Sequence, residues 1–172
     1  SLGINTSIRQ IENGEIVLKP TVISEFSGTS LPVGWSGVAF PPGGGTVVVA
    51  NNTVTLDGTR VGTDLAYGPG HSIESVATFN AARYQHVGFG VTFGTTAGEA
   101  WAIISTGSLG NQLYARTWSG TGAYDTQITP ITGSFFGAPH NYRVDWNENS
   151  IDYYVDGDLV ASHNVTITIP MR

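Results

Sequence analysis

Short runs in which apolar and polar residues alternate, separated by glycine, proline, asparagine and aspartate, fill almost the whole chain. Alternation with a period of two is typical of half-buried β-strands, because successive side chains of a strand point to opposite faces of the sheet. No stretch carries the capped stripe, with a period of about 3.6 residues, that an amphipathic helix requires. The pattern therefore predicts an all-β fold, an antiparallel sandwich or barrel. We expect strands at 15–19, 22–26, 46–50, 53–57, 60–64, 72–80, 85–94, 100–106, 112–118, 124–128, 140–146, 150–156, 158–163 and 165–169.

The composition agrees with a fold made of strands and turns. The chain has 172 residues, a length typical of one domain, with 23 glycines and 8 prolines. Only 12% of the residues are charged, about half the usual share, whereas long surface helices carry many lysines, glutamates and arginines. Because 40% of the residues are hydrophobic, the chain can bury a core.

The charge of the chain limits its partners. The formal net charge is −6, and Lys19 is the only lysine. Without a basic cluster we expect neither nucleic acid nor a membrane as a partner, and we favour a neutral ligand. No apolar run reaches the roughly 18 residues of a membrane-spanning helix. The lack of cysteine excludes disulfides and thiolate metal sites, and it suits a bacterial extracellular or cell-surface location without deciding it.

Two expected strands divide clearly into an apolar face and a second face. In "QHVGFGVTF" (85–93) the apolar face holds Val87, Phe89, Val91 and Phe93, and the other holds His86, Gly88, Gly90 and Thr92. In "QLYARTW" (112–118) Leu113, Ala115 and Thr117 oppose Gln112, Tyr114, Arg116 and Trp118. We expect Phe89 and Phe93 in the core. The second face mixes aromatic and polar side chains, which a dry core rarely accommodates, and its glycines leave room for a ligand.

The segment "HNYRVDWNENSIDYYVDGDLVASH" (140–163) carries the most distinctive pattern. A histidine, an aromatic residue and a tryptophan lead into an aromatic-rich strand that ends in Val-Asp-Gly, where Asp156-Gly157 suits a tight hairpin turn. This block resembles the concanavalin A-like lectin/glucanase jelly rolls, and it is most similar to the family 16 glycoside hydrolases within that group. The segments "EFSGTSLPVGW" (25–35) and "SIESVATF" (72–79) resemble further strands of the same fold.

The resemblance implies an all-β fold, an antiparallel two-sheet β-sandwich of the jelly-roll type. We expect one such domain over residues 1–172, as part of a larger protein with other domains. Residues 1–21 would form an N-terminal extension or edge strand, and residues 22–172 the core sandwich. The last strand of the family's fold has no counterpart at "ITIPMR" (167–172). Either the chain stops before that strand, or the N-terminal segment fills that edge.

One strand departs from the enzymes that the chain resembles. Family 16 enzymes carry Glu-x-Asp-x-Glu or Glu-x-Asp-x-x-Glu on a strand, which places the nucleophile and the acid/base side by side. The corresponding strand here would be 99–105, where alternate positions read Glu99, Trp101, Ile103 and Ser105. One glutamate cannot be both nucleophile and proton donor, so we assign no catalytic residue and predict a non-catalytic carbohydrate-binding module. Two alternatives stay open: a hydrolase or lyase that pairs Glu99 or Glu74 with an acid elsewhere, and a structural or adhesive module.

Saccharides are bound by aromatic rings that cover C–H faces and by planar polar side chains that reach hydroxyl groups. If the expected strands 85–94, 100–106 and 112–118 are neighbours, the concave face of their sheet would present aromatic and polar side chains of this kind to a polysaccharide or oligosaccharide. The candidate ligand-binding residues are His86, Glu99, Trp101, Tyr114, Arg116 and Trp118. Taken singly, each could equally be a core aromatic or a solvated charge.

The remaining histidines and a metal site complete the predictions. We expect His71 and His163 to be surface or capping residues and His140 to be structural. The sequence requires no cofactor. The resemblance implies a structural calcium ion bound by the backbone carbonyls of Glu25 and Gly58 and by an aspartate on the missing strand. The alternative is that this edge of the sheet binds no metal.

Overall fold

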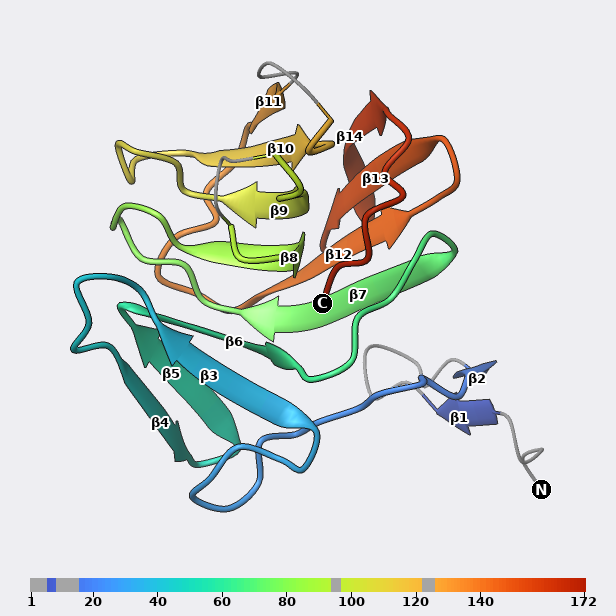
Figure 1. Ribbon diagram of the computed structural model, residues 1–172. Helices are drawn as coiled ribbons and strands as arrows, with labels where there is room; N and C mark the ends of the chain where they lie inside the picture. The colour runs from blue at the N-terminus through green and yellow to red at the C-terminus, as the bar shows by residue number, and fades with distance from the viewer. Residues whose placement is uncertain (1–5, 9–15, 94–96, 122–125) are drawn as a thin grey trace. The chain divides into compact units, whose positions relative to one another are not determined.

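The computed structural model describes residues 6–8, 16–93, 97–121 and 126–172, and these residues form strands and no helix (Figure 1). They fall into two compact units, Ser1–Thr63 and Asp64–Arg172, which are described separately. No helix in this part of the chain is long and apolar enough to cross a membrane. The expectation of a single domain over residues 1–172 stays a prediction.

The first unit consists of three antiparallel strand pairs. The pairs are β1 (Thr6–Ile8) with β2 (Ile16–Leu18), β3 (Trp35–Ala39) with β6 (Thr59–Thr63), and β4 (Thr46–Ala50) with β5 (Thr53–Asp57). Asn51 and Asn52 join β4 to β5 with φ angles of 53° and 58°, a conformation that asparagine tolerates and that the twist of a two-residue hairpin favours. The aromatic rings of Phe26 and Trp35 meet edge to face at 5.2 Å.

The second unit contains two four-stranded antiparallel sheets. One, here called the site sheet, has the order β11-β10-β9-β8 and appears in green, yellow and light orange in Figure 1. Its strands are β8 (His86–Gly90), β9 (Trp101–Ser105), β10 (Leu113–Trp118) and β11 (Gln127–Ile131). The other, here called the back sheet, has the order β14-β13-β12-β7. Its strands are β7 (His71–Ala77), β12 (His140–Trp146), β13 (Ser150–Val155) and β14 (Asp158–Asn164).

The two sheets pack face to face around one hydrophobic core. The site sheet contributes Phe89, Ala102, Ile104, Leu113, Ala115 and Ile131, and the back sheet contributes Tyr142, Val144, Trp146, Ile151, Tyr153 and Val155. The alternation along β12 and β13 sends every second side chain inward, and the rings of Phe89 and Trp146 meet at 5.5 Å across the core. The predicted antiparallel two-sheet sandwich is confirmed.

Some expected strands differ from the structure. The runs 22–26 and 165–169 form no strand, whereas β3 was not expected, and part of the expected strand 124–128 lies outside the described residues. Val22 and Ile23 are 40% and 68% exposed, so the apolar side chains of this run are largely open to solvent. The turn at Asp156-Gly157 is confirmed, because both residues have positive φ between β13 and β14.

Candidate functional site

The face of the site sheet that points away from the core, here called the open face, gathers most of the predicted ligand residues. The strand register places them in three rows across β8, β9 and β10. The rows are His86–Ser105–Tyr114, Gly88–Ile103–Arg116 and Gly90–Trp101–Trp118. The expectation that these strands are neighbours and share this face is therefore confirmed, while binding of a ligand to them stays a prediction.

The two tryptophans of the open face are buried. Trp101 and Trp118 are 5% and 3% exposed, and their rings lie 6.1 Å apart in a small second cluster with Ile103. The Arg116 guanidinium lies 5.1 Å from the centre of the Trp101 ring, a distance at which a cation is attracted to the aromatic face. Trp118, one of the aromatic residues expected to bind a ligand, is therefore part of the packed layer beneath the surface.

Phe93 contributes to this second cluster and not to the main core. Strand β8 ends at Gly90, and Phe93 has a positive φ of 61°, which breaks the extended alternation on which the prediction rested. Its ring folds back over Gly90 and stacks on the imidazole of His86 at 5.7 Å. The predicted core position of Phe93 is therefore wrong, while that of Phe89, 4% exposed, is confirmed.

The glycines of β8 allow neighbouring parts of the protein to pack closely against this strand. A Cβ on Gly88 would overlap the carbonyl of Ala102 on the neighbouring strand, and the space above Gly90 is filled by the Phe93 ring. The room that these glycines were expected to leave for a ligand is thus occupied by the protein itself.

His86 is held neutral on the open face. Its Nδ1 forms a 2.9 Å hydrogen bond with Ser105 Oγ, and the same oxygen accepts the amide N–H of Gly107 at 3.0 Å. Burial and, to a smaller extent, the positive charge of Arg116 together lower the pKa of His86 from 6.5 to about 4. At neutral pH the imidazole therefore offers hydrogen bonds without charge.

A small pocket opens beside these residues. It has a volume of about 150 Å³ and is lined by Gly107, Ser108, Leu109, Tyr114, Arg116 and Ile128. Leu109 and Ile128, 68% and 51% exposed, supply apolar surface, while Tyr114 and Arg116 supply a phenol and a guanidinium. A neutral hydroxylated molecule could meet both kinds of surface here.

Of the two glutamates considered for catalysis, one lies just before β9 of the site sheet and the other lies in β7 of the back sheet. Glu99 precedes β9, where its carboxylate accepts the amide N–H of Thr92 at 2.9 Å and the Thr92 hydroxyl at 2.5 Å. Glu74 lies exposed on β7 of the back sheet and accepts the Asn141 side-chain amide at 2.7 Å. Neither glutamate lines the pocket on the open face, and a pairing of Glu99 or Glu74 with an acid elsewhere stays a prediction.

Comparison with known proteins adds the family context. Residues 104–169, which run from the end of β9 past β14, match the family model described as glycosyl hydrolases family 16. Among solved structures, the chain is similar to a Bacillus licheniformis beta-glucanase, with a TM-score of 0.57 at 18% sequence identity. The similarity covers 86% of this chain and 79% of the glucanase chain. The fold is a concanavalin A-like jelly roll. None of the curated proteins matches the chain.

A buried polar network in this jelly roll had no clear signal in the sequence. Thr117 Oγ1 lies 2.5 Å from the Tyr153 hydroxyl and 2.7 Å from His163 Nδ1, and Thr129 Oγ1 lies 2.9 Å from His163 Nε2. The Tyr153 hydroxyl also donates to the carbonyl of Arg116 at 2.9 Å. His163 is only 3% exposed, so its expected surface role is wrong. The network ties the back sheet to strand β10 beneath Arg116.

The predicted calcium site uses the backbone carbonyls of Glu25 and Gly58. The Gly58 carbonyl already accepts the Phe40 amide N–H at 2.9 Å, and Glu25 is exposed. Among the described residues there is no group of three or more His, Cys, Asp or Glu side chains that could hold a metal ion. A site of two backbone carbonyls and one carboxylate does not need such a group, so calcium binding stays a prediction.

Proposed function

We propose that this jelly roll is a non-catalytic carbohydrate-binding module that holds a polysaccharide on its open face. The observation that carries the proposal is that Tyr114 and Arg116 of β10 share the open face with neutral His86 of β8. Tyr114 and Arg116 also line a pocket with an apolar rim. The tryptophan cluster beneath them holds Arg116 in place through its contact with Trp101. The face thus offers a rigid arrangement of donors, which reduces the entropy lost on binding.

The chemistry of the open face suits a neutral saccharide. Leu109, Ile128 and the Tyr114 ring can cover the C–H faces of sugar rings. The guanidinium of Arg116 can donate several hydrogen bonds to hydroxyl groups, and none of the described carboxylates forms an ion pair with it. The similarity to a beta-glucanase makes β-linked glucans the first ligands to test.

The absence of cleavage is part of the proposal. Hydrolysis by either standard mechanism needs two carboxyl groups, roughly 5–5.5 Å apart for retention or roughly 6.5–9.5 Å apart for inversion. The side chains that β9 presents to the open face are Trp101, Ile103 and Ser105, and none of these is acidic. We further propose that the module works in a bacterial extracellular or cell-surface protein that carries other domains, where it would keep that protein on its polysaccharide.

Affinity electrophoresis in gels that contain neutral polysaccharides tests the proposal. We expect a β-glucan or another neutral polysaccharide to retard the protein, and Tyr114→Ala to reduce this retardation. Tyr154→Ala is the matched control, because Tyr154 is a similarly half-buried tyrosine of the back sheet, where it contacts Arg143. If no common polysaccharide retards the protein, or if both variants lose retardation equally, the open face is not a carbohydrate site.

The enzyme alternative predicts a different result. A hydrolase that uses Glu99 would release reducing ends from the retarding polysaccharide and lose that activity in Glu99→Gln. We expect no release from either protein. The carboxylate of Glu99 is bound by Thr92, so its replacement should change retardation only modestly.

A further inference from the structure

A larger pocket lies at the end of the sandwich, apart from the open face. It has a volume of about 500 Å³ and shares no lining residue with the pocket beside Arg116. Its walls come from the segment that enters β10, from the end of β11 and from the connection between β11 and β12. The lining residues are Asn111, Gln112, Leu113, Ile131, Thr132, Gly133, Ser134, Phe135 and Phe136.

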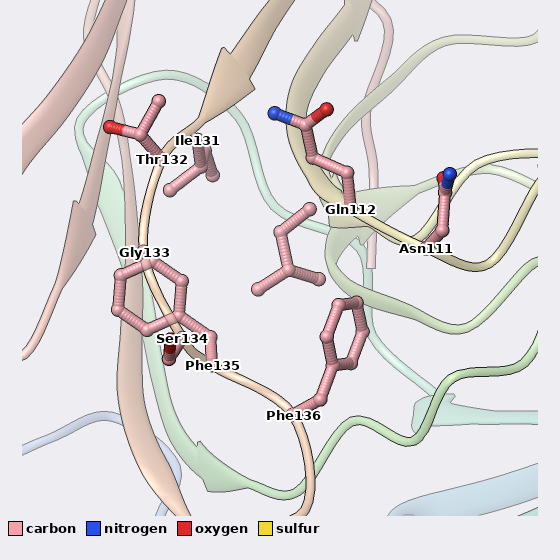
Figure 2. Close-up of a pocket in the computed structure, with 9 residues that line it drawn as sticks. Asn111, Gln112, Ile131, Thr132, Gly133, Ser134, Phe135 and Phe136 are labelled. Carbon is pink, nitrogen blue, oxygen red and sulfur yellow. The ribbon is translucent and has the colours of Figure 1, made fainter.

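The lining combines aromatic rings with uncharged polar groups. Leu113 and Ile131 are 1% and 2% exposed and belong to the core, so they supply a dry floor. In Figure 2 the rings of Phe135 and Phe136 stand on one side of the pocket, and the carboxamides of Gln112 and Asn111 stand on the other. None of the lining side chains is charged. An ionic ligand would therefore find no counter-charge in the lining.

The carboxamides are available to a ligand. Within the described residues, the side chains of Asn111 and Gln112 form no hydrogen bond with the protein. Each carboxamide can donate two hydrogen bonds and accept two. These groups can therefore reach the hydroxyl groups of a ligand without first giving up a bond to another residue of the described ranges.

The aromatic wall is held in place by the fold. The Phe135 ring meets the His140 imidazole edge to face at 5.3 Å and packs over Gly133, where a Cβ would overlap the ring. The backbone of Phe136 forms a bridge with Phe79, and the Gly137 amide N–H donates to the Phe79 carbonyl at 2.9 Å. These contacts build the wall before any ligand arrives, which favours binding.

We propose that this pocket is a second saccharide-binding site, which takes a neutral sugar unit between the phenylalanine rings and the carboxamides. The rings of Phe135 and Phe136 cover C–H faces, while Asn111 and Gln112 bind hydroxyl groups. The volume lies within the range of about 300–1,000 Å³ that is usual for small-molecule sites. If the open face also binds, as proposed above, the two sites would hold one polysaccharide at two points and raise its apparent affinity.

Nuclear magnetic resonance distinguishes the two sites. Short linear oligosaccharides of β-linked glucose, galactose or mannose are titrated into the isotope-labelled protein, with oligogalacturonate as the charged comparison. We expect one of the neutral sugars to shift the side-chain amide resonances of Asn111 and Gln112 saturably. The same shifts should persist in Arg116→Ala, whose substitution lies outside this pocket. Gln112→Ala should weaken this binding by about tenfold or more.

Each outcome decides between the two proposals. Shifts at Arg116 and His86 without shifts at Asn111 and Gln112 would overturn the second site and leave the proposed function standing. Shifts at the carboxamides alone would support the second site and contradict binding at the open face. If only oligogalacturonate shifts the carboxamides, or if no sugar does, the pocket is not a site for neutral saccharides.

Discussion

At the scale of single residues, His86 gives the open face a pH dependence. The pKa of His86 is lowered to about 4 in the folded protein, against 6.5 for an exposed histidine. Below pH 6.5 the unfolded chain binds this proton and the folded protein does not, so lowering the pH favours the unfolded chain. The stability that the neutral His86 contributes is therefore fully present above pH 6.5. It is lost as the pH falls from 6.5 to about 4. Burial lowers the pKa of His163 too, so this buried histidine acts in the same direction.

We therefore expect the free energy of unfolding to fall by roughly 3 kcal/mol between neutral pH and pH 4 on account of His86 alone. Urea denaturation at several pH values measures this loss. The variant His86→Gln should show a flatter profile over the same range. If its profile matches that of the wild type, His86 titrates normally and is not held neutral by its surroundings.

Phe89 lies in the main core and Phe93 packs against the tryptophan cluster, so their alanine variants compare the two hydrophobic clusters. Phe89→Ala should cost on the order of 3–5 kcal/mol, because it opens a cavity in the main core. Phe93→Ala should cost less, since Phe93 is only half-buried, but it should raise the pKa of His86 by removing the stacked ring and admitting water. Denaturation and histidine titration by NMR measure the two effects. Equal costs with an unchanged His86 would contradict the placement of Phe93.

At the scale of elements, the buried network beneath β10 joins the two sheets. Thr117, 1% exposed, contacts both Tyr153 and His163 Nδ1. Thr117→Val would leave that histidine nitrogen without its partner, while Tyr153 keeps its bond to the Arg116 carbonyl. We expect a loss of about 1–3 kcal/mol, the usual cost of an unsatisfied buried polar group. Thr129→Val removes one contact of His163 and should cost less. A Thr117→Val protein as stable as the wild type in urea would show that the network adds nothing.

The strands also show what the sequence could and could not predict. Period-2 alternation placed Tyr114 and Arg116 on the face opposite Ala115, as the structure has them, because alternation is a property of the strand itself. It could not predict how deeply Trp118 lies, since that depends on Phe93, which reaches it through a turn at positive φ. We therefore expect Trp118→Ala to destabilise the fold by roughly 3–5 kcal/mol, instead of testing binding alone.

The sequence did not predict the buried network or the larger pocket, because both depend on contacts between segments that are far apart in the sequence. His163 is buried because Thr117 and Thr129, on strands far away in the sequence, supply its hydrogen-bond partners. The pocket at Phe135 and Gln112 likewise forms where two distant segments meet. Contacts of this kind depend on the strand order of the sandwich, whereas the resemblance of residues 140–163 indicated only the type of fold.

At the scale of the whole molecule, the net charge of −6 bears on the ligand. A negatively charged protein repels polyanions, whereas a neutral polysaccharide is bound through shape and hydrogen bonds. We therefore expect binding to change little between low and high salt, because screening acts only on charged partners. Affinity electrophoresis at two ionic strengths measures this. Binding that collapses at high salt would point to an anionic ligand that uses Arg116 as its counter-charge.

The central claim is that the open face holds a polysaccharide through Arg116 and does not cut it. The most direct measurement is calorimetric titration of a retarding polysaccharide into wild type, Arg116→Ala and Arg143→Ala, followed by an assay of reducing ends in the same samples. Arg143 is the matched control, because its guanidinium also lies over an aromatic ring, that of Tyr154, but on the back sheet. We predict wild-type affinity for Arg143→Ala, a loss of about tenfold or more for Arg116→Ala, and no reducing ends in any sample. Equal affinity of the two variants, or reducing ends that accumulate with the wild type, would contradict the account.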